Sequence, residues 1–215
     1  MWPAATTAPA CARRVIIAGV VVAAGHTNAD YACLRQALDA GLSGFTHLFN
    51  AMSPLAAREP GAVGAGLEDL ASWCGLIVDG HHVDPVVLKL ALRCRPRNRF
   101  MLVTDAMPSV GSPEDHFMLQ GRRITVRDGL CLDPDGVLAG SDLNMAAAVR
   151  NARDLMDLDL PSAVALATAS PASFLGLSDR GHIQPGFAAD LVILDDDLSV
   201  IETWINGRSL GHGRT

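Results

Sequence analysis

The residues best suited to chemistry in this chain are histidines and aspartates that follow short apolar runs. Polar residues so placed in the first half are His26, His47, Asn50, Asp79, His82 and Asp105. Taken singly, a histidine at a strand end is more often a hydrogen-bonded edge residue than a metal ligand. Taken together, two imidazoles and a carboxylate suit a divalent ion with an open coordination position. Such an ion acidifies a bound water, and a nearby carboxylate can take and return protons.

These residues need a scaffold that brings separate segments together, and the chain's pattern predicts an α/β fold. Apolar runs indicate strands at 19–26, the start of 45–52, 74–80 and 99–107. Helices are predicted at 28–41 and 84–94, and a proline- and glycine-rich loop extends through Gly66. Alternating strands and helices favour parallel pairing. In a parallel barrel the carboxyl ends of the strands converge on one face, where the polar residues would meet.

The second half of the chain has a different pattern. Residues 117–138 indicate short antiparallel strands with turns at Asp128-Gly129 and Asp135-Gly136. Helices are predicted at 142–158 and 161–177, and β structure returns at 181–210.

Length and composition limit the classes of protein that fit. The 215 residues are 49% hydrophobic with a mean hydropathy of +0.25, which suffices for one large domain, or a medium domain with a small appendage, around a sizeable core. The net charge of −6 argues against a nucleic-acid partner. It still permits an anionic small molecule, because a few arginines can hold a phosphate on an acidic protein.

Cysteine usage and the N-terminal segment bear on the compartment. The five cysteines form no CxxC pair, which argues against a disulfide framework or a cysteine zinc site and favours a cytoplasmic protein. Arg13 and Arg14 precede an apolar run at 15–25, a pattern that resembles a signal peptide. A signal peptide is the less favoured of two interpretations of this run, and a buried strand is the other. The run is too short to span a bilayer and leads directly into His26. We therefore expect a buried strand there and no membrane partner.

Five sequence blocks carry a resemblance to a known family. GHTNA, THLFNAMSPLAAREPG, DGHHVDP, LVTDAM and LAGSDLNM, in this order, closely resemble the N-acetylglucosamine-6-phosphate deacetylase family of the amidohydrolase superfamily. The closing GHIQPGFAADLVILDDDL resembles the superfamily's C-terminal β segment. The resemblance implies a partial (β/α)8 TIM barrel of the metal-dependent hydrolase type over residues 1–180, with a β-hairpin insertion at about 117–138. Residues 181–215 would then supply a β segment of a small β-sandwich.

The resemblance also implies a reaction, the hydrolysis of N-acetylglucosamine 6-phosphate to glucosamine 6-phosphate and acetate. His26 and His47 resemble the histidine ligands of the catalytic metal, which is zinc or else iron, cobalt or manganese. Asp105 resembles the catalytic acid/base, which accepts a proton as water attacks the acetamide and then protonates the departing amine. An amide is a poor electrophile and an amine a poor leaving group, so the reaction needs both metal and proton donor.

Further residues match the family's substrate contacts. Arg58 resembles the phosphate-binding arginine, which in this family can reach a neighbouring subunit's site and so implies a homodimer. His82 matches the family's functional histidine, whereas its neighbour His81 is interpreted as an incidental replacement for an apolar residue. The full set of expected substrate-binding residues is Asn50, Ala51, Arg58, Asp79, His82, Leu138, Ala139 and Gly140.

The chain departs from the family at one motif. Family members carry a His-x-Glu-Gly-Pro motif that supplies a glutamate metal ligand and a substrate-binding histidine, and these 215 residues contain no such motif. A metal held by His26 and His47 would then lack one of the three protein ligands usual at catalytic zinc. Either this is a truncated deacetylase with little activity alone, or another chain or copy supplies the missing part.

Three functions therefore remain open from the sequence. The favoured hypothesis is the deacetylase itself. The second is a non-catalytic remnant or subunit that binds sugar phosphate without turning it over. The third is an amidohydrolase that acts on a different amide, which the block from Phe49 to Gly61 disfavours.

Overall fold

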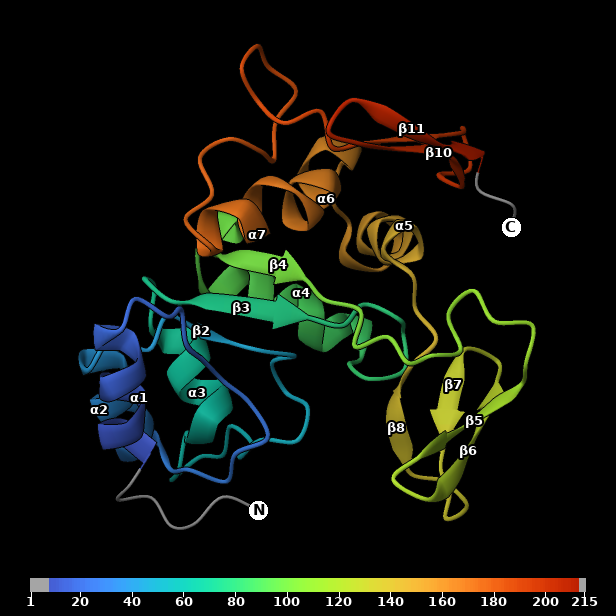
Figure 1. Ribbon diagram of the computed structural model, residues 1–215. Coiled ribbons are helices and arrows are strands. Elements are labelled where there is room, and N and C mark those ends of the chain that lie inside the picture. The colour runs from blue at the N-terminus through green and yellow to red at the C-terminus, as the bar shows by residue number, and fades with distance from the viewer. Residues whose placement is uncertain (1–7, 213–215) are drawn as a thin grey trace. The chain divides into compact units, whose positions relative to one another are not determined.

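The computed structural model describes residues 8–212 and divides into two units (Figure 1). The first unit contains residues 8–76 and 86–101, and the second contains residues 77–85 and 102–212. Strands and helices occur in both units, so the predicted α/β class is confirmed. No helix among residues 8–212 is long and apolar enough to cross a membrane.

The first unit is built on a four-stranded sheet in sequential order β1-β2-β3-β4. Its strands are β1 (Ala23–Ala24), β2 (Gly44–Phe45), β3 (Trp73–Leu76) and β4 (Phe100–Leu102). β2 pairs in parallel with both β1 and β3, as the alternating pattern predicted. The strands are shorter than the apolar runs that indicated them, so His47, Asp79 and Asp105 lie in the loops beyond the strand ends.

Helices connect these strands in the order expected for repeated β–α units. They are α1 (Ala8–Ile17), α2 (Tyr31–Asp39), α3 (Gly61–Glu68) and α4 (Pro85–Cys94), and a 3₁₀ turn (Arg97–Arg99) precedes β4. Asp30 caps α2 by accepting a hydrogen bond from the Cys33 backbone N–H at 2.8 Å. Fully buried Phe45, Leu48 and Phe100 belong to the core of this unit, and each such side chain contributes roughly 1.5–3 kcal/mol through burial.

Two predictions for the first unit are wrong. The run at 15–25 is not a buried strand: α1 extends to Ile17, only Ala23–Ala24 is extended, and Val20 and Val21 are 50% and 41% exposed. A short apolar run cannot be assigned to strand or helix from its hydrophobicity alone, which explains the error.

The second wrong prediction is the loop through Gly66, because Gly61–Glu68 forms α3. A Cβ at Gly66 would lie 3.0 Å from Leu48 Cδ1 and 3.2 Å from Phe45 Cγ. The glycines that suggested a loop thus permit close helix packing, and packing outweighs their poor helix propensity.

The second unit contains an antiparallel sheet of order β5-β6-β7-β8 (Figure 1). Its strands are β5 (His116–Leu119), β6 (Arg122–Arg127), β7 (Leu130–Leu132) and β8 (Leu138–Ser141). Asp128 and Gly129 have φ values of 52° and 79°, as a two-residue type I′ hairpin turn requires, so that predicted turn is confirmed. Gln120 and Gly121 form a second such turn, with φ values of 49° and 80°, which was not predicted.

The rest of the second unit is helical and then β. The helices are α5 (Met145–Met156), α6 (Leu160–Ala167) and α7 (Ala169–Phe174), followed by antiparallel β9 (Leu191–Leu194), β10 (Val200–Ile205) and β11 (Arg208–His212). The single helix predicted at 161–177 is wrong, because it divides at Thr168. Pro171 has no N–H to donate to the carbonyl of Ala167 and its ring clashes with that carbonyl, so a continuous helix cannot pass.

Candidate active site

His26 and His47 meet because of the register between β1 and β2. Ala24 pairs with Phe45, and each histidine lies two residues beyond its strand's member of that pair. The two side chains are therefore level at the carboxyl ends of adjacent parallel strands. Their ring centroids are 4.7 Å apart with an interplanar angle of 86°. The sequence prediction that these imidazoles come together is confirmed.

The backbone at both histidines lies in the left-handed region, with φ of 45° at His26 and 30° at His47. Residues with a Cβ rarely adopt this conformation, and such strain gathers at functional sites. Gly25 permits the close approach, because a Cβ there would overlap the Cγ2 of Thr46. The fold thus holds these imidazoles in an arrangement that local preference alone would not produce.

The two imidazoles fit two positions of a metal site. His47 is 6% exposed, and its buried Nδ1 has no hydrogen-bond partner among the described residues. A buried polar nitrogen without a partner is unfavourable, and a divalent cation would satisfy it. Within residues 8–212 no group of three or more His, Cys, Asp or Glu side chains is gathered to hold a metal. The described residues therefore fit a metal only as a two-histidine part of a site.

The residues that follow His47 also include positive φ angles. Asn50 donates its backbone N–H to the carbonyl of His47 at 2.9 Å, and Phe49 and Ala51 have φ of 83° and 49°. Ala51 and Arg58 are exposed, and Asn50 is partly so. The first unit thus carries His26, His47, Asn50, Ala51 and Arg58 on two connected loops.

Asp79 and His82 form a pair in the second unit. His82 Nδ1 lies 2.5 Å from Asp79 Oδ2, and the side chains are only 7% and 5% exposed. Asp79 Oδ1 also accepts the backbone N–H groups of His81 and His82 at 2.9 and 2.8 Å. Burial would raise the pKa of Asp79, but these hydrogen bonds and the His82 charge lower it to about 2. The bond to Asp79 in turn raises the pKa of His82, despite burial, with a further contribution from Asp105.

Asp105 lies in a loop tied to the end of β8. Its backbone carbonyl accepts the Ser141 N–H at 2.9 Å, and the Ser141 carbonyl accepts the Met107 N–H at 2.9 Å. A Cβ at Gly140 would lie 3.2 Å from the Asp105 carbonyl oxygen, so the Leu138–Gly140 segment adjoins Asp105. Asp105 is exposed and has a φ of 52°. The second unit therefore brings together Asp105, the Asp79–His82 pair and the β8 segment.

Two residues outside the predicted set hold these groups. Ser141 bonds to the Asp105 loop through its backbone, and its hydroxyl donates to the Thr104 carbonyl. Asn151 of α5 donates its side-chain amide to the Val78 carbonyl at 2.8 Å, directly before Asp79. Ser141 lies within LAGSDLNM and could have been found there, whereas Asn151 gives no local signal.

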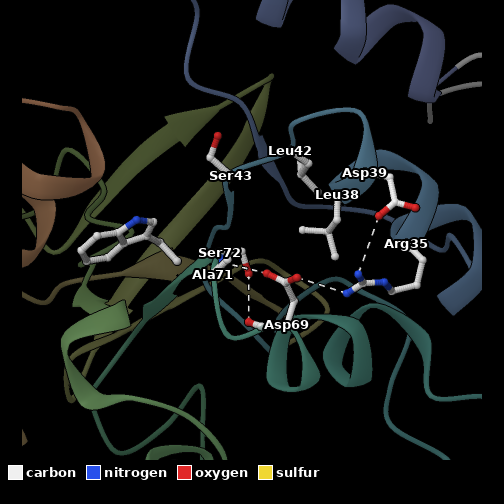
Figure 2. Close-up of a pocket in the computed structure, with 9 residues that line it drawn as sticks. Arg35, Leu38, Asp39, Leu42, Ser43, Asp69, Ala71 and Ser72 are labelled. Atoms are coloured by element: carbon white, nitrogen blue, oxygen red, sulfur yellow. Dashed lines mark hydrogen bonds and ion pairs between the residues drawn. The ribbon is translucent and has the colours of Figure 1, made fainter.

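Two cavities among residues 8–212 are lined by none of the predicted site residues. Figure 2 shows one of about 230 Å³ in the first unit, where Arg35 pairs with Asp69 at 3.1 Å and Asp69 accepts the Ser72 N–H at 2.7 Å. Ser43 and Ser72 directly precede β2 and β3, so this cavity is at the amino ends of the strands. The other, of about 600 Å³, is an apolar groove between α5, α6, β9 and β10 in the second unit. Neither carries the expected chemistry.

Comparison with known proteins identifies the class. A model of the amidohydrolase family matches residues 8–210, and the chain belongs to this family. It is 44% identical over 199 residues to an N-acetylgalactosamine-6-phosphate deacetylase from Shewanella, covering 92% of this chain and 50% of that protein. The amidohydrolase superfamily is generally metal-dependent, which accords with the paired histidines.

Solved structures give the same class. The N-acetylglucosamine-6-phosphate deacetylase from Pasteurella multocida is 33% identical with a TM-score of 0.90, covering 95% of this chain and 54% of that one. A variant of the Mycobacterium smegmatis enzyme, in complex with N-acetyl-D-glucosamine 6-phosphate, is 36% identical with a TM-score of 0.89, covering 96% and 55%. The resemblance found in the sequence is thus confirmed. This chain spans about half the length of each of these relatives.

Proposed function

We propose that this chain takes part in metal-dependent deacetylation of an N-acetylhexosamine 6-phosphate, giving the hexosamine 6-phosphate and acetate. The observation that carries the proposal is the level pair His26 and His47, with a buried His47 nitrogen that lacks a partner among the described residues. Sequence relatives and structural neighbours named as such deacetylases support it.

His26 and His47 would hold the divalent cation, for which zinc, iron, cobalt or manganese are candidates; when bound, the ion supplies Lewis acidity to the hydrolysis. Asp105 accepts a proton from the attacking water and donates it to the nitrogen of the breaking C–N bond; transfer of the remaining water proton to the same nitrogen then gives acetate and the protonated amine. Asp79 fixes the orientation of His82 through Nδ1, which leaves Nε2 to donate to a substrate oxygen when the ring is protonated.

The phosphate end of the substrate is assigned to Arg58. A sugar phosphate carries about two negative charges near neutral pH, and a guanidinium binds phosphate through paired N–H donors. We propose that Arg58 acts in a homodimer, where it reaches the neighbouring subunit's substrate. Asn50, Ala51 and Leu138–Gly140 are proposed to contact the sugar.

The proposed architecture is a partial (β/α)8 barrel over residues 1–180, with the β5–β8 sheet as an insertion, and a β segment of a small sandwich over residues 181–215. The sequential parallel order β1-β2-β3 supports the barrel. The antiparallel strands β9–β11 support the separate β segment.

The sugar's configuration has two candidates. The resemblance of the sequence blocks favours N-acetylglucosamine 6-phosphate, but a relative named for N-acetylgalactosamine 6-phosphate is 44% identical, against 33% and 36% for two glucosamine enzymes. Acetate release should be measured for both sugar phosphates and for both sugars without phosphate. A larger rate on either phosphate supports the proposal, whereas equal rates without phosphate favour an amidohydrolase for another amide.

Metal content and turnover of the 215-residue chain test the proposal against a non-catalytic sugar-phosphate binder. Stoichiometric, tightly held metal together with acetate release would exclude the non-catalytic function. Binding of sugar phosphate with neither metal nor turnover would overturn catalysis by this chain alone.

A further inference from the structure

The loop that carries Arg58 is bonded directly to the segment that follows His26. Glu59 Oε1 accepts two backbone hydrogen bonds, from Tyr31 N–H at 2.8 Å and from Gly61 N–H at 2.9 Å. Tyr31 is the first residue of α2 and Gly61 the first residue of α3. One carboxylate oxygen therefore joins the starts of two helices, where backbone N–H groups lack partners within the helix and negative charge is favoured.

Ser53 makes a second set of bonds between the same two segments. Its hydroxyl donates to the Ala29 carbonyl at 2.6 Å and accepts the Ala62 N–H at 2.8 Å. Its backbone N–H donates to the Thr27 carbonyl at 3.0 Å. Residues 27–31, which begin directly after His26, are thus held by Ser53 at one end and by Glu59 at the other.

The loop between these two residues is closed on itself. The Ala56 N–H donates to the Glu59 carbonyl at 3.0 Å, which makes a turn that contains Arg58. Gly61 has a φ of 61°, and a Cβ there would lie 2.6 Å from the Pro54 carbonyl oxygen. The backbone of Arg58 is therefore confined between a hydrogen-bonded turn and a tightly packed helix start.

We propose that Glu59 is a positioning residue that fixes the Arg58 loop against the segment after His26, so that each subunit presents Arg58 in one defined position to the neighbouring subunit's substrate. This inference rests on the proposed function, because it assigns phosphate binding to Arg58. Glu59 itself contacts neither substrate nor metal in this assignment. Its effect on the ligand passes entirely through the Arg58 loop.

The two backbone hydrogen bonds that Glu59 accepts are called the clamp below. Three variants of the 215-residue chain test whether these bonds, and not the negative charge of Glu59, position Arg58. Glu59→Ala removes both hydrogen bonds, whereas Glu59→Gln retains an Oε1 acceptor for both donors and should restore the clamp. Glu114→Ala is the matched control, because Glu114 is an exposed glutamate of the second unit. Circular dichroism and thermal melts identify any variant that fails to fold, in which case Glu59→Asp, whose side chain is one methylene shorter, takes the place of Glu59→Ala.

Amide hydrogen exchange measured by NMR tests the clamp without substrate or metal. In Glu59→Ala the Tyr31 and Gly61 amides should exchange about tenfold faster, and in Glu59→Gln and Glu114→Ala they should not. Unchanged exchange at both amides in Glu59→Ala would overturn the inference while leaving the proposed function intact.

Binding of glucosamine 6-phosphate and glucosamine, measured by NMR titration, tests the effect on Arg58. Glu59→Ala should weaken the phosphate ligand about tenfold and leave glucosamine affinity unchanged, a difference that general destabilisation would not produce. In the double variant with Arg58→Ala, removal of Glu59 should cause no further loss, since Glu59 acts through Arg58. Additive losses would overturn the positioning role, and wild-type protein that does not bind the phosphate would overturn the proposed function as well.

Discussion

His82 Nδ1 and Asp79 Oδ2 lie 2.5 Å apart, and both side chains are almost wholly buried. The same carboxylate also accepts two backbone N–H groups, so it is held as an anion by three hydrogen bonds. A buried anion of this kind stabilises a protonated imidazole beside it. The pair therefore provides an orientated imidazole, with a pKa raised by the hydrogen bond to Asp79, in the part of the second unit that also contains Asp105.

Asp79→Asn should lower the pKa of His82. The side-chain hydrogen bond to Asp79 is the main cause of the raised pKa, so burial would dominate once the anion is removed. An NMR titration of the His82 ring protons measures the change. Asp115→Asn, which removes an exposed carboxylate beside a different histidine, should leave the His82 titration where it is.

Stability should depend on pH through the same pair. The pKa of Asp79 is lowered from 3.8 to about 2, so its contribution, on the order of 2 kcal/mol, is present above pH 3.8 and lost as pH falls through 2. His82 has a raised pKa, so its contribution is full below pH 6.5 and lost as pH rises through the folded value.

Urea unfolding of wild type and Asp79→Asn at pH 2, 5 and 8 measures both effects. The free-energy difference between the two proteins should be largest near pH 5 and smaller at either extreme. A difference that is constant across the three pH values would contradict the assigned pKa shifts.

His47→Ala should weaken divalent-metal binding by at least about tenfold, because it removes one of the two proposed imidazole ligands. Calorimetric titration with zinc gives the affinity directly. His81→Ala is the control, since His81 is an exposed histidine with no expected role at the metal. Equal loss in both variants would indicate nonspecific binding by surface histidines.

Asp105→Asn should reduce acetate release by about 10²-fold or more, because it removes the proposed proton acceptor and donor. Metal affinity should be retained, since the proposed ligands are His26 and His47. The bonds between this loop and Ser141 use the Asp105 backbone carbonyl, so the fold should persist. An unchanged rate in a protein with normal metal content would remove Asp105 from the mechanism.

Gly66→Ala should destabilise the first unit by about 1–3 kcal/mol through overpacking. The new methyl would meet Leu48 and Phe45 at 3.0 and 3.2 Å, and both neighbours are fully buried. Denaturant unfolding measures the loss. Improved stability would show that helix propensity, which favours alanine, outweighs the packing constraint.

The sequence predicted best where one local rule decides the structure. The type I′ turn at Asp128-Gly129 follows from residues that tolerate positive φ, and it is present. Gln120-Gly121 adopts the same turn without the preferred first residue, because the flanking strands impose it. Helix α3 was missed for a similar reason. Its Gly66 is needed because the helix packs closely against Phe45 and Leu48, which are distant in sequence.

The candidate site was predictable as a set of residues but not as an arrangement. Apolar runs indicated that His26 and His47 end neighbouring strands, and the register of β1 on β2 brings their rings together. The Asp79–His82 bond needed a tight turn that spacing alone does not specify. Glu59 lies within the THLFNAMSPLAAREPG block, but its role could not be read from the sequence, because its partners are backbone N–H groups of Tyr31 and Gly61.

The left-handed backbone at His26, His47 and Asp105 has a consequence for engineering. Glycine adopts positive φ without the steric cost that a Cβ incurs, so replacement by glycine at these positions would relieve strain while deleting the reactive group. A screen that selects only for thermal resistance would therefore tend to erase the site. Selection of more thermostable variants of this chain must therefore keep ligand binding as a second criterion. At these three positions, a substitution that raises stability also removes the side chain that the proposed function needs.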